Sequence, residues 1–183
     1  MAQKQKNKTK KKRKRSQQRF IAERARALAV VYLTRRDDLI VTEEPGDVGI
    51  DLSVTLNAEN KGGHRKFGVE LRGDWAAMTA DNANQILRPA MHEMQQYGPF
   101  PFPVVLFFFT KENNEARYTW AAEPLVSATG EFEIIRHGEA SCRPLNSEAI
   151  DELVDAVDRW YDAFFARATR ETPDSRRKTS SAN

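Results

Sequence analysis

Residues 46–73 carry the clearest alternation of apolar and polar side chains in the chain, and this pattern predicts a β-hairpin. The alternation runs through positions 50–57 and returns at positions 66–72, after a Lys-Gly-Gly turn. A period of two on both sides of a glycine-rich turn is typical of antiparallel strands with one buried face. Folding the segment symmetrically about Asn60 and Lys61 sets its register. The predicted pairs on the buried face are Ile50 with Leu71, Leu52 with Val69, and Val54 with Phe67.

On the other face of this hairpin, the same register places the carboxylates of Asp51 and Glu70 directly opposite each other. Ser53 faces Gly68 beside them, which leaves open space, and Arg72 follows Glu70 on the same face. Like charges in such a pair destabilise a sheet, so a compensating charge is expected. Two sources of this compensating charge are possible. A divalent cation can bind the hard carboxylate oxygens, or the Arg72 guanidinium can make a surface salt-bridge cluster.

This arrangement resembles the PD-(D/E)XK, or restriction-endonuclease-like, nuclease superfamily, in which an Asp on one strand precedes a Glu-x-Lys tripeptide on the next. The matching residues are Gly49-Ile50-Asp51 and Glu70-Leu71-Arg72. The chain looks most like a bacterial branch of unknown function with a GID strand and a later strand that ends near a Trp and a Pro, here Trp120 and Pro124. The resemblance spans residues 18–170 and departs from the family pattern where Arg72 stands in place of the Lys.

The resemblance implies a nuclease that uses Mg²⁺ or Mn²⁺ to hydrolyse phosphodiester bonds. Asp51 and Glu70 would hold the metal, with the backbone carbonyl of Leu71 as a third oxygen ligand and Glu23, on the preceding helix, as a further one. An exposed helix carboxylate is the alternative for Glu23. In the family, the Lys orients or activates the attacking water. Arg72 cannot be a general base, because arginine does not deprotonate in proteins, but it can clamp a phosphate oxygen in the transition state.

The substitution at Arg72 leaves three hypotheses for the function. The first is a working nuclease, with Asp51, Glu70 and Arg72 as its catalytic residues. The second is a nuclease-like domain that binds nucleic acid or a partner protein without cutting, and the third is a protein-interaction module in a defence or mobile-element system. DNA is the expected nucleic acid, and a homodimer stays open. Asp47, in the turn before Asp51, is a further candidate ligand, although a turn Asp needs no function.

The charge of the chain is divided between two opposite parts. Residues 1–15 hold nine Lys and Arg and no acid, so the remainder holds 29 − 9 = 20 basic against 26 acidic residues, a net charge of −6. A basic run of this kind is normally disordered, and we predict a disordered basic tail over residues 1–16. Such a tail can bind phosphates by counterion release. A role in solubility, or a nuclear localisation cluster at residues 10–15, is the alternative.

The remaining pattern predicts an α/β fold with a central mixed β-sheet flanked by helices, as in the restriction-endonuclease-like core. Residues 104–109 are apolar without alternation, which fits a central strand buried on both faces. Helices are predicted over residues 17–34 and 79–97 and from residue 147 onward, with further strands over 39–41, 118–122 and 132–135. One domain over residues 17–171 would be followed by a polar C-terminal tail over residues 172–183.

Cysteine usage and hydropathy favour a cytoplasmic protein without membrane contact. The single Cys142 excludes an intramolecular disulfide and favours a reducing compartment. The sequence holds no CxxC motif and no His/Cys cluster, which argues against a zinc site. The segment after the basic run lacks the clean apolar stretch of a secretory signal, and the apolar run at residues 104–109 is too short to span a bilayer.

Overall fold

A single mixed sheet of seven strands organises the part of the chain that the structure, a computed structural model, describes: residues 2–46, 49–57, 63–112 and 114–171. The strands are β1 (Leu39–Glu43), β2 (Leu52–Leu56), β3 (Arg65–Asp74), β4 (Val104–Thr110), β5 (Ala116–Val126), β6 (Phe132–Arg136) and β7 (Arg143–Pro144). They lie in the order β1-β2-β3-β4-β5-β6, with β7 paired to β5. Neighbouring strands are antiparallel except β3 and β4, which are parallel.

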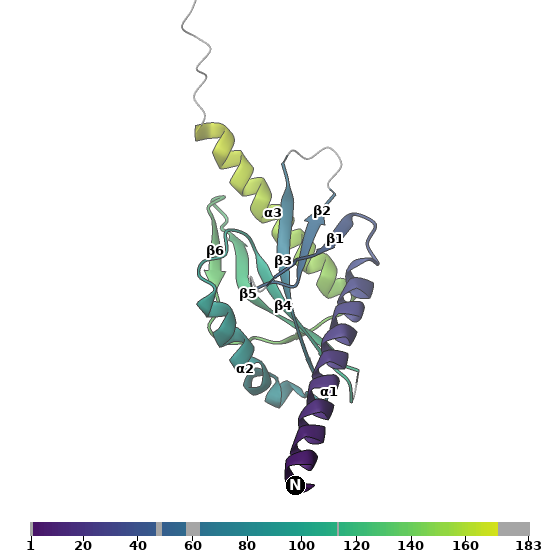
Figure 1. The fold of residues 1–183 in the computed structure, drawn as a ribbon. Coiled ribbons are helices and arrows are strands. Elements are labelled where there is room, and N and C mark those ends of the chain that lie inside the picture. The colour runs from purple at the N-terminus through teal and green to yellow at the C-terminus, as the bar shows by residue number, and fades with distance from the viewer. Residues whose placement is uncertain (1, 47–48, 58–62, 113, 172–183) are drawn as a thin grey trace, which may run out of the picture.

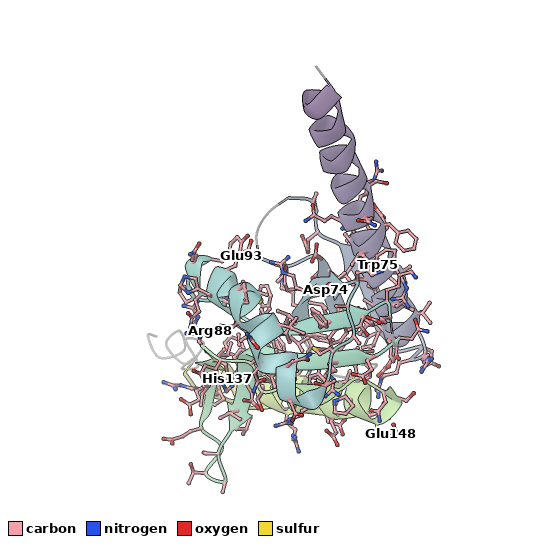
Figure 2. The ribbon with its side chains drawn as sticks, turned by 90° about the horizontal axis from the view of Figure 1, so that it is seen from below. Asp74, Trp75, Arg88, Glu93, His137 and Glu148 are labelled. Atoms are coloured by element: carbon pink, nitrogen blue, oxygen red, sulfur yellow. The ribbon has the colours of Figure 1, made fainter. Side chains whose placement is uncertain are left out.

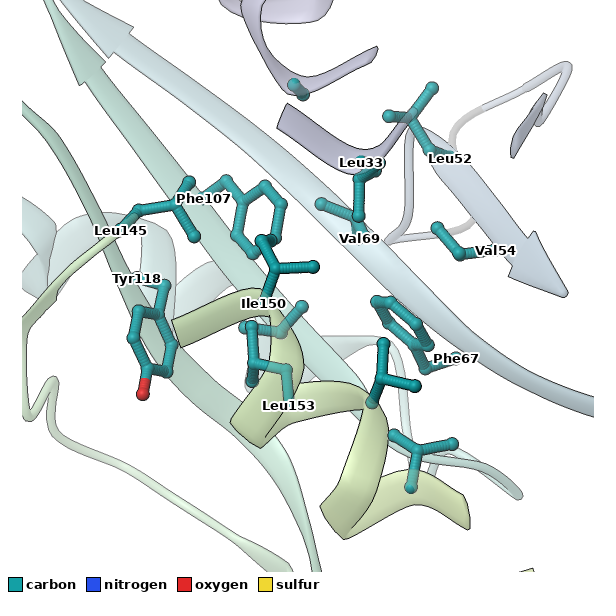
Figure 3. Close-up of a cluster of buried hydrophobic side chains, with 14 of the residues drawn as sticks. Leu33, Leu52, Val54, Phe67, Val69, Phe107, Tyr118, Leu145, Ile150 and Leu153 are labelled. Atoms are coloured by element: carbon teal, nitrogen blue, oxygen red, sulfur yellow. The ribbon is translucent and has the colours of Figure 1, made fainter. Parts of the chain in front are cut away.

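Three helices of the described residues cover the two faces of this sheet (Figure 1). They are α1 (Ala2–Leu33), α2 (Ala80–Gln96) and α3 (Ser147–Glu171). Helices α1 and α3 share one core with the sheet, in which Leu33, Phe67 and Leu153 are buried (Figure 3). Helix α2 packs on the opposite face through a second core that includes Leu87 and Met91. The predicted fold class, an α/β fold with a central mixed sheet flanked by helices, is confirmed.

Helix α2 makes the connection that the parallel pair β3 and β4 requires. Parallel neighbours need a crossover of a dozen or more residues, usually a helix. Thr79 starts this helix with a capping box, in which its Oγ1 accepts from the Asn82 N–H at 3.4 Å and the Asn82 Oδ1 accepts from the Thr79 N–H at 2.8 Å. No helix among the described residues combines the length and the apolar character needed to cross a lipid bilayer.

The β2–β3 hairpin has the predicted register over most of its length. Leu52 pairs with Val69 and Val54 with Phe67, and all four side chains enter the core under α1 and α3. The prediction is wrong for Ile50, because β2 begins only at Leu52. Ile50 instead belongs to the core under α2, on the opposite face of the sheet.

The space beside Gly68, which we expected to be open, is filled by Ile50. A Cβ atom added to Gly68 would lie 2.7 Å from Cγ2 of Ile50. The preceding Gly49 makes this turn possible, because its φ of +79° is one that residues with side chains rarely adopt. A Cβ on Gly49 would also lie 2.7 Å from the Tyr97 ring. Gly49 therefore permits the backbone conformation just before Asp51, and Gly68 leaves room for the Ile50 side chain.

Helix α1 begins much earlier than predicted. We expected a disordered tail over residues 1–16, whereas the helix starts at Ala2 and its N-terminal turns project beyond the sheet (Figure 1). Lys, Arg and Gln are good helix formers, and a helix already nucleated where Ala25 and Ala29 pack on the sheet extends at little cost. Residues 172–183 lie outside the described part of the chain, so the C-terminal tail stays a prediction.

Helix α1 lies directly against the end of β3. A Cβ atom added to Gly73 would lie 2.5 Å from Cγ2 of Ile21 and 3.5 Å from the Cβ of Ala25. Glycine at this position therefore allows the backbones of α1 and β3 to approach more closely than any side chain would permit. This contact holds the middle of α1 against the strand that carries Glu70 and Arg72.

We predict that Gly68→Ala destabilises the protein by about 1–3 kcal/mol, because the added methyl group overlaps Ile50. In an Ile50→Ala background the same change should cost clearly less, since the closest contact is removed and only Phe102 at 3.2 Å and Val104 at 3.3 Å stay near the added Cβ. Urea unfolding of the wild type, the two single variants and the double variant measures this coupling. An equal cost of Gly68→Ala in both backgrounds would show that Ile50 does not fill this space.

Candidate active site at the open edge of β3

The C-terminal half of β3 extends past its partner β2 and leaves an open sheet edge. Strand β2 pairs with β3 only as far as Val69, whereas β3 continues to Asp74 with β4 on its other side. Asp51 lies where this open edge begins. Its Oδ2 accepts a hydrogen bond from the backbone N–H of Leu71 at 2.8 Å, in place of a further residue of β2. A carboxylate thus caps the edge of the sheet.

The backbone of Asp51 is fixed by two further hydrogen bonds. Its N–H donates to the Val69 carbonyl at 2.9 Å, and its carbonyl accepts from the Glu44 N–H at 2.9 Å.

Within a strand, the N–H and C=O groups of one residue point to the same side. The carbonyl of Leu71, predicted as a third oxygen ligand, therefore faces the same side as its N–H, toward Asp51.

Glu70 is the buried member of the carboxylate pair, with 6% of its surface exposed. The carboxylate of Asp51 lies close enough to raise the pKa of Glu70. Arg72 places Nη1 at 2.7 Å from Oε1 of Glu70 and Nη2 at 2.8 Å from Oε2 of Glu93, a residue of α2. The predicted proximity of Asp51, Glu70 and Arg72 is therefore found, and Arg72 does pair with one of the two acids.

The ion pair with Arg72 does not fully compensate the charge of Glu70. Burial raises the pKa of Glu70 to about 7, and the nearby carboxylates of Asp51 and Glu93 act in the same direction. Arg72 lowers this pKa, but by less than burial raises it. Burial and the two neighbouring carboxylates thus favour the protonated form of Glu70 by more than Arg72 favours the ionised form.

A second arginine, Arg26 of α1, reaches Asp51 from the other side. Its Nη2 lies 3.8 Å from Oδ1 of Asp51, and its Nη1 lies 3.7 Å from Oε2 of Glu43 on β1. Four carboxylates, those of Asp51, Glu70, Glu93 and Glu43, therefore share the charge of two arginines in this cluster. The surplus of negative charge favours the binding of a cation.

Glu23, predicted as a further ligand, is not brought into this cluster. Its side chain is exposed on α1, and no hydrogen bond or ion pair within the described part of the chain joins it to Asp51 or Glu70. Arg26, three residues further along the helix, takes the place that was predicted for Glu23. Asp47, the other candidate ligand, lies outside the described residues.

Three further members of the cluster, Arg26, Glu43 and Glu93, were not predicted from the sequence. Their part in the cluster depends on how α1, β1 and α2 pack on the sheet, and the local sequence does not specify it. Only Arg26 carried a usable signal, because it follows Ala25 on the face of the helix that packs on β3. An arginine beside such a buried position can extend along the sheet surface and reach its edge.

The oxygen donors of this cluster fit Mg²⁺ or Mn²⁺. Across the described residues, no three His, Cys, Asp or Glu side chains converge closely enough to hold a metal ion by themselves. Mg²⁺ is commonly bound by only one or two carboxylates, with waters and substrate phosphates in the other positions. Asp51 and Glu70, with the Leu71 carbonyl beside them, supply that number of ligands.

A cavity of about 450 Å³ opens next to the cluster, between α1 and the end of β3. Its walls include Gln17 and Ile21 from α1, and Leu71, Arg72 and Trp75 from β3 and the loop after it. Figure 2 shows Trp75 beside α1. The volume is within the range of ligand pockets. Arg72 lines this cavity and also belongs to the carboxylate cluster, so it joins the two.

Comparison with known proteins provides no relative from which a function could be transferred. The chain matches no protein-family model, and the comparisons with curated proteins and with solved structures found no match. The resemblance to the PD-(D/E)XK superfamily therefore rests on the residues quoted above and stays a prediction. Function has to be argued from the geometry and the charge of the site itself.

Proposed function

We propose that the protein is a metal-dependent nuclease that hydrolyses phosphodiester bonds, with Asp51 and Glu70 as its metal ligands. The observation that carries this proposal is the pair of neighbouring carboxylates at the open edge of β3, in which Asp51 is held by the Leu71 N–H and Glu70 is buried beside Arg72. Perturbed carboxyl groups of this kind cluster at functional sites. The adjoining cavity, which Leu71 and Arg72 line, would hold a phosphate group beside Arg72.

Each residue of the cluster has a distinct part in this proposal. A divalent cation, when bound, would supply a nucleophilic water at neutral pH and neutralise phosphate charge. Asp51 and Glu70 would hold it, and the hydrogen bond from the Leu71 N–H orients Asp51 for that purpose. Arg72 would donate to a phosphate oxygen through the N–H groups that its two ion pairs leave free. Glu93 is a positioning residue, because it holds the Arg72 guanidinium in place.

The positive charge that attracts a nucleic acid is supplied by the N-terminal half of α1. Nine Lys and Arg fall within residues 1–15, and the rest of the chain has a net charge of −6. The same helix continues into Gln17 and Ile21, which form one wall of the cavity. A phosphate backbone bound along this half of α1 is thereby led to the cavity mouth. We propose DNA as the substrate.

A second candidate function is nucleic-acid binding without cleavage, and the ion pairs of Arg72 favour it. Arg72 is engaged by Glu70 and Glu93, so a metal ion has to compete with a guanidinium for the Glu70 carboxylate. Where the guanidinium prevails, the cluster is a salt-bridged surface and the basic half of α1 alone provides binding. The two candidates differ in whether any metal supports cutting.

The nuclease proposal predicts that Mg²⁺ or Mn²⁺ supports cleavage and that EDTA prevents it. The substrates to be tested are linear, circular and single-stranded DNA, and RNA. Asp51→Ala and Glu70→Ala should each abolish cleavage without loss of the fold. Arg72→Ala should lower the rate by roughly 10²–10³-fold, as the loss of one transition-state donor does. Arg72→Lys should keep much of the activity or raise it.

Glu152→Ala, which removes an exposed carboxylate on α3, is the matched control for these variants and should cut at the wild-type rate. Cleavage by Asp51→Ala at the wild-type rate would exclude this site. Retention of nucleic acid without cutting in every metal tested would support the binding function instead.

We predict that Glu70 makes stability fall as pH rises. Its folded-state pKa of about 7 lies above the ordinary value of 4.5, so the folded state binds the proton more tightly than the unfolded state between these values. The free energy of unfolding should therefore decrease from about pH 4.5 to 7 and level off above, by about 3 kcal/mol at most. Urea unfolding from pH 5 to 8 in EDTA measures this, and Glu70→Gln should remove it whereas Glu152→Gln should not.

Excess Mn²⁺ should reduce the same pH dependence in the wild type, because a bound cation favours ionised Glu70. An identical pH profile for the wild type and Glu70→Gln would contradict the perturbed carboxyl group. If Glu70→Gln changes the pH profile but Mn²⁺ does not, the raised pKa of Glu70 would be supported and the metal site would be contradicted.

Replacing the basic residues within positions 4–15 by Gln should weaken binding to every nucleic-acid sequence. Gln keeps the helix propensity of the segment, so the change removes charge rather than structure. The loss should be on the order of 10²-fold at low salt if about five phosphates are contacted, with a shallower salt dependence. Filter binding at several salt concentrations measures both. Arg143→Gln with Arg159→Gln, on other elements, is the control, and an unchanged affinity of the Gln-substituted protein would contradict the prediction.

A further inference from the structure

Two large aromatic side chains form an exposed pair at the rim of the cavity. Phe20 of α1 is 50% exposed and Trp75, directly after β3, is 45% exposed. Their ring centroids lie 6.1 Å apart with an interplanar angle of 51°. The proposed nuclease site does not use this pair, and exposed aromatic surface beside a polar cluster is characteristic of a binding site.

The position of Trp75 is set by main-chain hydrogen bonds. The Lys111 N–H donates to the Asp74 carbonyl at 3.0 Å, and the Glu112 N–H donates to the Trp75 carbonyl at 3.2 Å. The Glu112 carboxylate also accepts from the Ala77 N–H at 3.0 Å. The loop that carries Trp75 is thus tied to the end of β4 on both sides of the residue. The backbone at Trp75 is therefore held in place, so little ordering of the loop is needed when a ligand binds.

A lysine lies over one of the two rings. Nζ of Lys111 lies 4.6 Å from the centroid of the Trp75 ring. Phe20 follows Arg19 and continues the basic half of α1. The nearest acids serve the loop itself, since Asp74 accepts from the Ala76 N–H and Glu112 from the Ala77 N–H. A ligand that combines a flat apolar face with negative charge is complementary to these surroundings.

The aromatic pair is also connected to the proposed active site. Trp75 and Arg72 both line the cavity, and Phe20 lies between the cavity residues Gln18 and Ile21 in the sequence of α1. A chain that contacts both rings therefore passes the cavity that Arg72 lines. Nucleic acid is the polyanion that carries flat faces at regular intervals along its backbone.

We propose that Phe20 and Trp75 form a stacking platform for an unpaired base, so that the substrate at this site is single-stranded nucleic acid. The proposal rests on the proposed function for the role of the neighbouring phosphate, which would lie at the cavity beside Arg72. Base–aromatic stacking tolerates any sequence, because every base has a π-face. In a duplex these faces are covered by neighbouring bases, and the rings reach them only after a base is extruded.

The test measures binding in EDTA, where cleavage cannot interfere, by anisotropy of a labelled 16-nucleotide oligo-dT and of a labelled 16-base-pair duplex. Trp75→Ala should weaken binding of the single strand on the order of 10-fold or more and change duplex binding by less than about 2-fold. Trp75→Phe should retain most of the single-strand affinity, and Phe20→Ala should resemble Trp75→Ala. Phe164→Ala, which removes an aromatic ring of similar exposure on α3, should change neither.

Unlabelled competitors separate a base-stacking site from a site for any polyanion. Unlabelled oligo-dT should displace the probe at a much lower charge concentration than dextran sulfate, which lacks bases. Equal competition by the two, unchanged single-strand affinity in both Trp75→Ala and Phe20→Ala, or equal losses for single strand and duplex would each overturn the stacking platform. So would wild-type protein that binds no nucleic acid.

A parallel cleavage assay with Mg²⁺ distinguishes failure of this inference from failure of the proposed function. Single-strand preference that depends on Trp75, without metal-dependent cutting, supports the platform and refutes the nuclease. Metal-dependent cutting by a protein whose Trp75→Ala variant keeps its single-strand preference supports the nuclease and refutes the platform.

Discussion

The hydrogen bond from the Leu71 N–H to the Asp51 carboxylate is the interaction on which the arrangement of the site depends. It satisfies a backbone donor at an open sheet edge with a charged side chain, and such charge-assisted bonds are stronger than neutral ones. Beside this bond, β2 begins at Leu52 and Ile50 lies in the core on the other face of the sheet. The same bond holds the Asp51 carboxylate next to that of Glu70, whose position is fixed by the paired strand β3.

Two buried charged side chains of β3, Arg65 and Glu70, differ in how much opposite charge surrounds them. Arg65, at the start of the strand, has carboxylate partners on α3 at 2.6 Å and 2.7 Å, from Asp158 and Asp162. Glu70, further along the same strand, has one arginine partner and two neighbouring acids. A buried charge with an excess of opposite charge fastens β3 to α3. A buried charge with too little opposite charge around it, as at Glu70, destabilises the fold unless a cation binds there.

The sequence predicted secondary structure well wherever burial of one face produced a regular alternation of apolar and polar residues. Alternation identified β2 and β3, because a slip by one residue would expose Val54 and Phe67, and the apolar run of β4 indicated its central position. Ile50 fits the same alternation and still points the other way. Its placement depends on the turn at Gly49 and on the room above Gly68, and neither is visible in a pattern of apolar and polar residues.

The candidate site was predictable only where its residues share the hairpin. Asp51, Glu70 and Arg72 were found because the register brings them together, whereas Arg26 and Glu93 come from helices whose orientation on the sheet is a tertiary property. The start of α1 was missed for a related reason. Composition describes the basic run in isolation, but the helix is nucleated further along, where Ala25 and Ala29 are buried.

The helical conformation of the basic run gives it a fixed length. At a rise of 1.5 Å per residue, residues 2–17 extend over about 24 Å. The same residues fully extended would reach roughly twice as far. A helix of about 24 Å would run beside only about seven nucleotides of the proposed nucleic acid, at a spacing of about 3.4 Å along one strand. Helix α1 contacts β3 where Gly73 meets Ile21, so one end of this length lies at a fixed point next to Arg72. A nucleic acid bound along α1, as proposed above, would therefore be contacted over a segment of defined length that ends beside Arg72.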